Sequence, residues 1–189
     1  MNISQDLAQT ITFHCAPTLT GIKPASLVSR KNPQGSDLNG EIRQLNDLLN
    51  GHGIFVKRLC DCTQRNLLLV YRHHLLQRLL QTPRIRLFLQ REGYPVSSDL
   101  KACIDFLKKR IGASVEFPHE IGLFLGYPVD DVMGFIEHRG QNFRMCGHWK
   151  VYSDEARAIG MFERFNRCRE QLCKKLAQGF QFQELLTVS

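Results

Sequence analysis

A thiol and an imidazole stand side by side near the start of the chain, at His14 and Cys15, and a lysine follows at Lys23. They belong to a tract, residues 13–27, whose proline, glycine and threonine content is typical of an irregular segment. Loops held on a rigid scaffold often carry chemistry. A cysteine becomes a nucleophile or redox group when a nearby cation lowers its pKa and yields the thiolate. Cys15 is therefore the centre of a candidate thiol site.

Two interpretations of Cys15 remain open. In an extended tract, neighbouring side chains point to opposite faces, so Lys23, or a His119 brought near by folding, is a better partner than His14. A pKa shift of two units needs ~2.7 kcal/mol of differential stabilisation, which one well-placed cation can supply. A free cysteine is, however, among the residue types most often buried, where it acts as a small hydrophobe.

A second candidate pair, His119 and Glu120, follows Pro118 at the expected start of a short helix. The pair could orient a ligand or serve in acid–base chemistry, and Glu120 equally fits simple compensation of the helix dipole. No second histidine follows four residues later, so this is not the zinc-protease helix. The candidate catalytic residues are Cys15, Lys23, His119 and Glu120.

Two short motifs, Cys60-x-Cys62 and Cys146-x-His148, each place two soft ligands on one face of an expected strand. Their spacing is shorter than the spacing of zinc knuckles, so we expect no metal site, and no cofactor is assigned.

The whole net charge of +7 resides in residues 57–91, which hold eight basic side chains against Asp61 alone. Arginine dominates this span, and its guanidinium suits bidentate capture of carboxylate or phosphate. The span is either a solvated basic face or a surface for an acidic protein, a phosphate-bearing cofactor or nucleic acid. The candidate binding residues are Arg72, Arg78, Arg84, Arg86 and Arg91.

Residues 123–132 imitate a helix-turn-helix, but the second helix carries Asp130, Asp131 and Glu137. These carboxylates would be repelled by phosphates, so we do not expect sequence-specific DNA binding.

The length of 189 residues favours one globular domain, residues 1–179, followed by a loose segment, 180–189. The opening residues lack the basic and apolar regions of a signal peptide, and no apolar run reaches the roughly 18 residues that span a bilayer. Seven irregularly spaced cysteines then indicate reduced thiols. We expect a cytoplasmic protein without a membrane segment.

Hydrophobic periodicity and turn residues predict the elements that position these groups. The expected helices are 3–12, 38–50, 73–91 with an interruption at Pro83, 98–111 capped by Ser97 or Ser98, 118–126, 128–138, and a long one from a Ser153 cap to Gly179. The expected strands are Ile54–Cys60 and Asn66–Tyr71, paired as an antiparallel hairpin, and 144–152, which holds Trp149; residues 30–37 form a loop. This pattern predicts an α+β (mixed α/β) fold with a small sheet packed against several helices.

Three segments together resemble an uncharacterised bacterial family, domain of unknown function 3793, common in anaerobes. They are His14-Cys15-Ala16-Pro17-Thr18-Leu19 with Gly21-Ile22-Lys23-Pro24-Ala25-Ser26-Leu27; His119-Glu120-Ile121-Gly122-Leu123-Phe124-Leu125-Gly126-Tyr127-Pro128 with residues 131–136; and Gly147-His148-Trp149-Lys150-Val151-Tyr152. The resemblance covers nearly the whole chain. His148 stands where the family's pattern implies tyrosine, which argues against a catalytic or metal role at that position. The resemblance implies a relative and no established activity.

Two functional hypotheses follow. In the first, the protein performs redox or nucleophilic chemistry on a small ligand with Cys15, assisted by Lys23, His119 or Glu120. In the second, it is a non-catalytic binding module that presents the arginines of residues 57–91 to an acidic or anionic partner.

Overall fold

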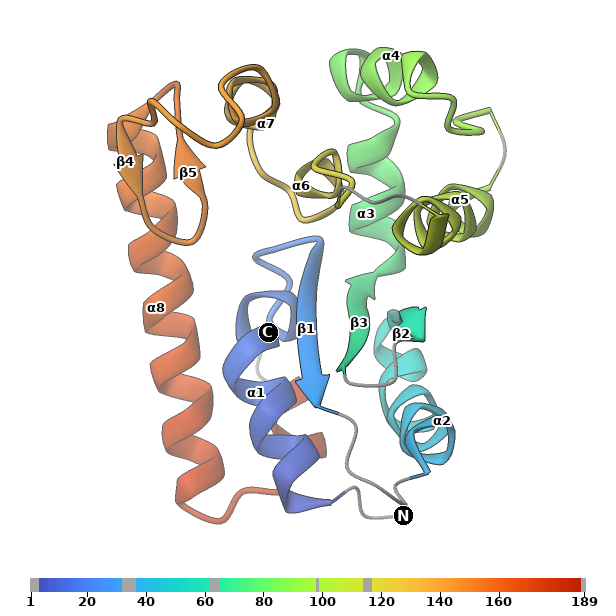
Figure 1. Ribbon diagram of the computed structural model, residues 1–189. Coiled ribbons are helices and arrows are strands. Elements are labelled where there is room, and N and C mark those ends of the chain that lie inside the picture. The colour runs from blue at the N-terminus through green and yellow to red at the C-terminus, as the bar shows by residue number, and fades with distance from the viewer. Residues whose placement is uncertain (1–3, 32–36, 62–64, 98, 114–116, 188–189) are drawn as a thin grey trace.

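The computed structural model describes residues 4–31, 37–61, 65–97, 99–113 and 117–187, which fold as an α+β protein (Figure 1). Along the chain the elements are α1 (Gln5–Leu19), β1 (Ala25–Lys31), α2 (Leu38–Leu49), η1 (Asn50–His52), β2 (Ile54–Asp61), β3 (Arg65–Arg72), α3 (His73–Leu80), α4 (Pro83–Arg91), α5 (Leu100–Ala113), α6 (Ile121–Phe124), α7 (Val129–Glu137), β4 (Met145–Cys146), β5 (Lys150–Val151), α8 (Glu155–Ala177) and η2 (Phe182–Thr187). Here η marks a 3-10 helix. The mixed α+β class predicted from the sequence is confirmed.

The main sheet has the strand order β1-β3-β2, and β3 is antiparallel to both neighbours. The predicted hairpin of β2 and β3 is confirmed. In the central strand, Leu68 and Val70 face one hydrophobic cluster while Leu69 faces another. A strand covered on both faces needs a continuous apolar run rather than an alternating one, which explains the leucine-rich sequence of β3.

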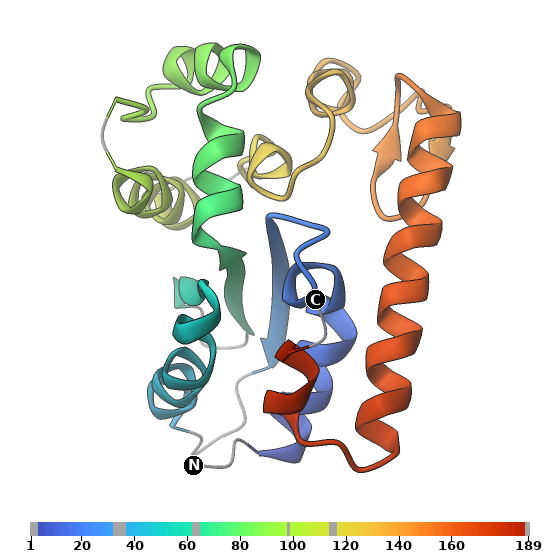
Figure 2. The ribbon, with the colours of Figure 1, turned by 180° about the vertical axis from the view of Figure 1, so that it is seen from behind.

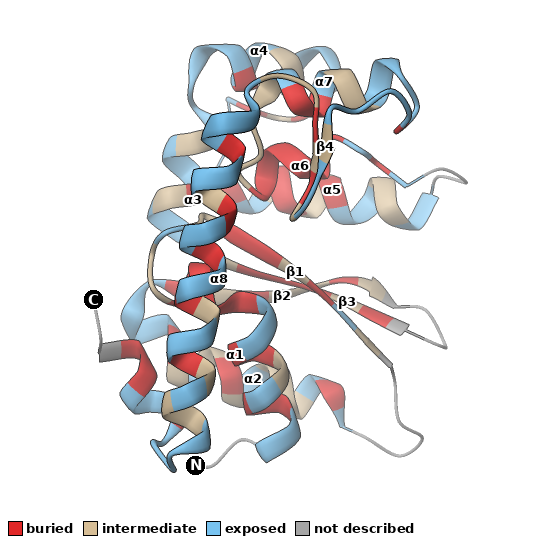
Figure 3. Ribbon diagram, turned by 90° about the vertical axis from the view of Figure 1, so that its left-hand side faces the viewer, coloured by how far each residue is buried: buried red, intermediate tan, exposed pale blue. Residues whose placement is uncertain are grey.

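Helices cover both faces of this sheet (Figure 3). The first cluster joins one face to α1, α2, η2 and the C-terminal half of α8, whereas the second joins the other face to α3, α4, α5 and α6. A third, smaller cluster packs the β4–β5 hairpin on the start of α8 around Trp149.

The N-terminal tract is helical as far as Leu19 and joins β1 at Ala25, which corrects the expectation of an irregular segment from Phe13 onward. The Ser4 side chain accepts a hydrogen bond from the backbone N–H of Leu7, and α1 then continues to Leu19 with Pro17 inside it. Proline lacks the N–H that would bond to the carbonyl of Phe13, and its ring crowds that carbonyl; the helix ends two residues later, at Leu19. Beyond the helix, the Pro17 carbonyl accepts the N–H groups of Ile22 and Lys23, at 2.8 and 2.9 Å, and this turn leads into β1.

The expected strand 144–152 is instead a tight hairpin, and Trp149 lies in its turn. The turn places Gly147 directly against Phe162: a Cβ atom at Gly147 would lie 2.1 Å from the Phe162 ring. The chain can therefore reverse there only with glycine, and the reversal divides the apolar run in two.

Helix caps also differ from expectation. The Asp154 side chain, rather than Ser153, caps α8 by accepting the N–H of Arg157. At α5, the Asp99 carboxylate accepts the N–H of Ala102, while Ser98 lies outside the described residues.

Residues 180–189, expected to be loose, contain η2, whose Phe182, Leu185 and Leu186 are buried in the first cluster beside α1 (Figure 2). The apolar side chains of η2 explain why this segment packs against the core.

The expected break at Pro83 is confirmed, since α3 ends at Leu80 and α4 begins at Pro83. Most of the expected loop at 30–37 falls outside the described residues. Among the residues that the structure describes, no helix is both long and apolar enough to cross a membrane.

Candidate functional site

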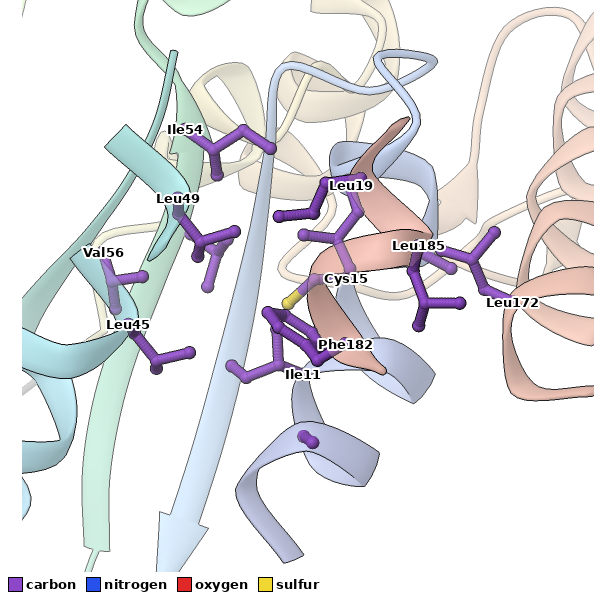
Figure 4. Packing of buried hydrophobic residues seen from close by; sticks show 14 of the residues in the cluster. Ile11, Cys15, Leu19, Leu45, Leu49, Ile54, Val56, Leu172, Phe182 and Leu185 are labelled. Carbon is purple, nitrogen blue, oxygen red and sulfur yellow. The ribbon is translucent and has the colours of Figure 1, made fainter. Parts of the chain in front are cut away.

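Cys15 is a core residue in this structure. It is fully buried within the first cluster, and Figure 4 shows its sulfur pointing into the side chains packed between α1, α2 and η2. Burial raises the pKa of the Cys15 thiol to about 12, although Lys23 and a hydrogen bond with Ser26 act in the opposite sense. At neutral pH the thiol is therefore protonated and inaccessible, which is the opposite of what a nucleophile requires.

The other three candidate catalytic residues have different partners. Lys23 is close enough to Cys15 for each group to shift the pKa of the other. His119 is exposed and packs against the Phe135 ring, with 4.9 Å between ring centroids. Glu120 belongs to a structural ion pair, because its buried carboxylate receives the Tyr94 hydroxyl at 2.8 Å and the Arg110 Nε at 2.9 Å. The structure thus brings Lys23 to Cys15, whereas Glu120 is paired with Arg110 and Tyr94 and His119 lines a cavity together with Tyr127.

Lys23 occupies an unusual environment for a lysine. Its Nζ lies 5.1 Å from the centroid of the Tyr127 ring and 5.7 Å from that of Phe165. Within the described part of the chain, Lys23 forms no ion pair with a carboxylate. Burial lowers the pKa of Lys23 to about 8, and the positive charge of Arg169 contributes in the same direction.

Arg169 adds a second cation to the same place. It follows Phe165 by four residues on α8, so the two side chains share one face of the helix. Its guanidinium carbon lies 4.8 Å from the Phe13 ring centroid, and its Nε is buried without a hydrogen-bond partner. Like Lys23, Arg169 forms no ion pair among the described residues.

Two histidines complete this group. Burial and the charge of Arg169 lower the pKa of His14. Burial, Arg169 and Lys23 lower the pKa of His148, against a hydrogen bond with Asn166, whose Oδ1 lies 2.9 Å from the imidazole Nε2. We call Lys23, Arg169, His14 and His148 the Lys23 cluster.

The Lys23 cluster gathers basic groups without neutralising them. No carboxylate is among the described groups whose charge perturbs the pKa of His14, Lys23 or His148. Lys23 and Arg169 are both partly exposed, and a partly buried cation without a counter-ion is less favourable than a paired one. Chemically, this arrangement can bind an anion, and it can also present a lysine amine that loses its proton easily.

Tyr127 connects this cluster to a neighbouring cavity. Its ring stacks on Trp149, with centroids 4.9 Å apart, and both rings line a mostly apolar cavity of about 440 Å³. The wall is held rigidly by the buried Asp131. Its carboxylate accepts hydrogen bonds from the Trp149 indole at 2.7 Å and from both backbone and side chain of Ser153.

A protein-family model with the description "Protein of unknown function (DUF3793)" matches residues 11–186. The match covers nearly the whole chain. The chain belongs to the DUF3793 family. Comparisons with curated proteins and with solved structures gave no match. The matched range contains every member of the Lys23 cluster, and the family's description assigns no activity to any of them.

In this member of the DUF3793 family, the five candidate arginines differ in their contacts. Arg72 is held at the end of α1, where it donates to the carbonyl oxygen of Thr18 at 2.7 Å and to that of Leu19. Arg84 forms a bidentate pair with Asp130, at 2.6 and 3.2 Å. The remaining three are exposed and form no ion pair among the described residues: Arg78, Arg86 and Arg91.

Among the residues that the structure describes, no three His, Cys, Asp or Glu side chains gather closely enough to hold a metal ion. Cys62 lies outside those residues, so what we predict of Cys60-x-Cys62 stays a prediction.

The sequence analysis did not identify Arg169, Tyr127 or Phe165 as site residues. Phe165 has the spacing of a core position on α8, and Arg169 is one of several basic residues there. The one available signal was Lys23 itself, a lysine within a mostly apolar tract.

Proposed function

We propose that this protein binds a small anion, a carboxylate or a phosphate, at the Lys23 cluster. The observation that carries the proposal is the Lys23 ammonium, which lies within 6 Å of two ring centroids without an ion-pair partner in the described structure. Arg169, also without an ion pair there, is near enough for its charge to lower the pKa of Lys23. An anion would supply the missing countercharge and accept hydrogen bonds from both side chains, and such charge-assisted bonds are the stronger kind.

This proposal replaces the thiol chemistry first suggested by Cys15. A thiol that is fully buried, with its pKa raised to about 12, supports a packing role. In this proposal Lys23 and Arg169 bind the anion, and His148 contributes only to the local electrostatic potential. This minor role agrees with the fact that His148 stands where the family's pattern implies tyrosine.

The test is thermal unfolding at constant ionic strength with increasing inorganic phosphate or lactate. A ligand that binds only the folded state raises the midpoint in a saturable way. We expect this rise in the wild type, a marked reduction in Lys23→Met and Arg169→Met, and full retention in the matched variants Lys174→Met and Arg167→Met, whose residues are exposed.

General salt effects are the main confounder, because phosphate stabilises many proteins by exclusion from their surfaces. Such an effect would be equal in all four variants and would not saturate. An equal rise in all variants, or no rise with either anion, contradicts the proposal.

The alternative, in which an acidic partner docks on the arginines of residues 57–91, now depends on Arg78, Arg86 and Arg91. The specific support is that these three are exposed without ion pairs in the described structure. Arg86 and Arg91, however, lie five residues apart on α4 and therefore diverge by about 140° around the helix. Salt-sensitive binding of poly-glutamate that is lost on replacing all three with glutamine would support this function.

A further inference from the structure

The apolar cavity beside Tyr127 is a second place at which this molecule can bind a ligand. Its volume is about 440 Å³, and residues of α6, α7 and the β4–β5 hairpin line it. We infer that the cavity binds a small aromatic acid, whose fused rings lie against the aromatic side chains of the wall and whose carboxylate pairs with Lys150. Neither Lys23 nor Arg169 is among the described residues that line the cavity, so this inference goes beyond the proposed function and does not depend on it.

Aromatic side chains from four places in the chain line the cavity: Phe117, Tyr127, Phe135 and Trp149. Such rings attract a flat aromatic ligand beyond what the buried area alone contributes, because ring faces and ring edges carry opposite partial charges. An apolar cavity of about 150 Å³ can hold benzene. A cavity of about 440 Å³ therefore has room for two fused rings with a short side chain.

Close contacts among the lining residues hold this wall in shape. A Cβ atom at Gly122 would lie 2.8 Å from the Val132 side chain and 3.2 Å from the Tyr127 ring, so α6 and α7 meet tightly there. The Trp149 indole donates to the Asp131 carboxylate at 2.7 Å, and the Tyr127 ring stacks on the indole. A site that is already formed loses little conformational freedom when its ligand binds.

Lys150 brings a half-buried positive charge to the same wall. Its Nζ lies 4.8 Å from the centroid of the Phe143 ring and 5.7 Å from that of Phe135, and it donates one hydrogen bond, to the Gly140 carbonyl at 2.7 Å. An ammonium group has three N–H donors. Within the described residues Lys150 forms no ion pair with a carboxylate, so a ligand carboxylate can use the donors that remain.

Asp131 also lines the cavity, but its carboxylate is already engaged. Its Oδ2 accepts a hydrogen bond from the Trp149 indole, and its Oδ1 accepts three more from Tyr152 and Ser153, each at 2.8 Å. These donors stabilise the negative charge of Asp131 within the protein. Lys150 is not matched in this way, so an aromatic acid suits the cavity better than a neutral aromatic ring, and an aromatic amine would be repelled by the ammonium.

Cys146 offers a local measure of occupancy, because it is exposed and lines the cavity. Three probes separate the rings from the charge: naphthylacetate has both, naphthylacetamide has the rings alone, and acetate has the carboxylate alone. The rate of Cys146 alkylation by N-ethylmaleimide is followed in the native protein by peptide mass spectrometry at constant ionic strength. We expect saturable protection by naphthylacetate, about tenfold weaker binding of the amide, no protection by acetate at the same concentrations, and an unchanged rate at Cys173, which lines a different cavity.

Lys150→Met is the decisive variant, because methionine keeps an unbranched apolar side chain and removes the charge. Naphthylacetate should then protect Cys146 no better than the amide does. Protection by the amide should stay at its wild-type level, which shows that the cavity is intact. The matched variant Lys174→Met, at an exposed lysine of α8, should leave the binding of both ligands unchanged.

Three results would overturn the inference. If the acid and the amide protect the wild type equally, Lys150 does not bind a carboxylate and the ligand class is wrong. If neither of them protects Cys146, the cavity is not a site for aromatic ligands. Lys23→Met should show the same protection as the wild type, and its loss there would mean that the acid binds at the Lys23 cluster instead.

Discussion

Arg72 donates a hydrogen bond from Nε to the carbonyl oxygen of Thr18, at 2.7 Å, so the end of β3 closes the C-terminus of α1. The last carbonyl groups of a helix have no partner within the helix, and a cation placed there also complements the helix dipole. Arg72, first considered for a ligand surface, is thus used inside the fold. It stabilises the turn from which Lys23 extends.

Replacing Arg72 with methionine should lower the free energy of unfolding by about 1–3 kcal/mol, because buried helix carbonyls lose their donors. The matched replacement of the exposed Arg78 should change it by less than about 0.5 kcal/mol. Urea titration measures both. Equal effects of the two replacements would show that the contact with Thr18 contributes nothing.

Lys23→Met should stabilise the protein at pH 7, because it removes a desolvated charge without a countercharge. The pKa of Lys23 is about 8 in the folded chain, below its ordinary value of 10.5. Between these values the unfolded chain binds more protons, so wild-type stability should rise with pH across this window, and the penalty is complete below pH 8. The advantage of Lys23→Met should therefore shrink from pH 7 to pH 10. A less stable variant at pH 7 would contradict this account.

Alkylation should separate the cysteines by exposure. Cys146 is exposed and should react with iodoacetamide in the native protein, whereas Cys15, fully buried and with its pKa raised to about 12, should react only after unfolding. Mass spectrometry of peptides labelled over a range of pH gives each rate. Native labelling of Cys15 with a midpoint below pH 8 would restore the thiol hypothesis.

Asp131→Asn should destabilise the protein by about 2–4 kcal/mol, since one buried carboxylate accepts hydrogen bonds from Trp149, Tyr152 and Ser153. Trp149 is the only tryptophan, so the emission maximum of the protein should shift to the red as the indole loses its hydrogen bond to Asp131. The neighbouring Asp130→Asn breaks only the exposed pair with Arg84 and should cost less than about 1 kcal/mol. The prediction fails if the two variants are equally stable.

Glu120→Gln should weaken the fold and spare ligand binding. Its carboxylate holds Arg110 and the Tyr94 hydroxyl, so loss of the charge should cost about 1–3 kcal/mol. The saturable rise in midpoint with phosphate should remain, because no residue of the Lys23 cluster is changed. Loss of that rise in a folded variant would return Glu120 to the ligand site.

Local patterns predicted several elements correctly because the forces that define them are local. The apolar spacing of α5, the proline that separates α3 from α4, and the paired runs of β2 and β3 are each contained within one short stretch. The tract at Cys15 was misjudged for a related reason. Its proline and threonine lower helix propensity, but tertiary packing of Ile11, Cys15 and Leu19 against the sheet outweighs that weak preference.

The candidate site could be predicted only in part. Cys15 and Lys23 are near in sequence and remain near in space, so the tract did point to the right region. Arg169 and Phe165 lie on α8, and nothing in their own surroundings indicates that they meet Lys23. The His119 segment was expected to approach Cys15, yet its neighbour Glu120 is committed to Arg110 and Tyr94.

The packing of α1 against α8 and η2 also sets the order of events during synthesis. Thr20 and Cys168 are in contact although 148 residues separate them, so the partners of α1 leave the ribosome long after α1 itself. Contacts across such a long loop must be assembled late and form slowly. Until then the part of α1 that packs on α8 and η2 stays uncovered, and exposed apolar surface of this kind makes a nascent chain prone to aggregation.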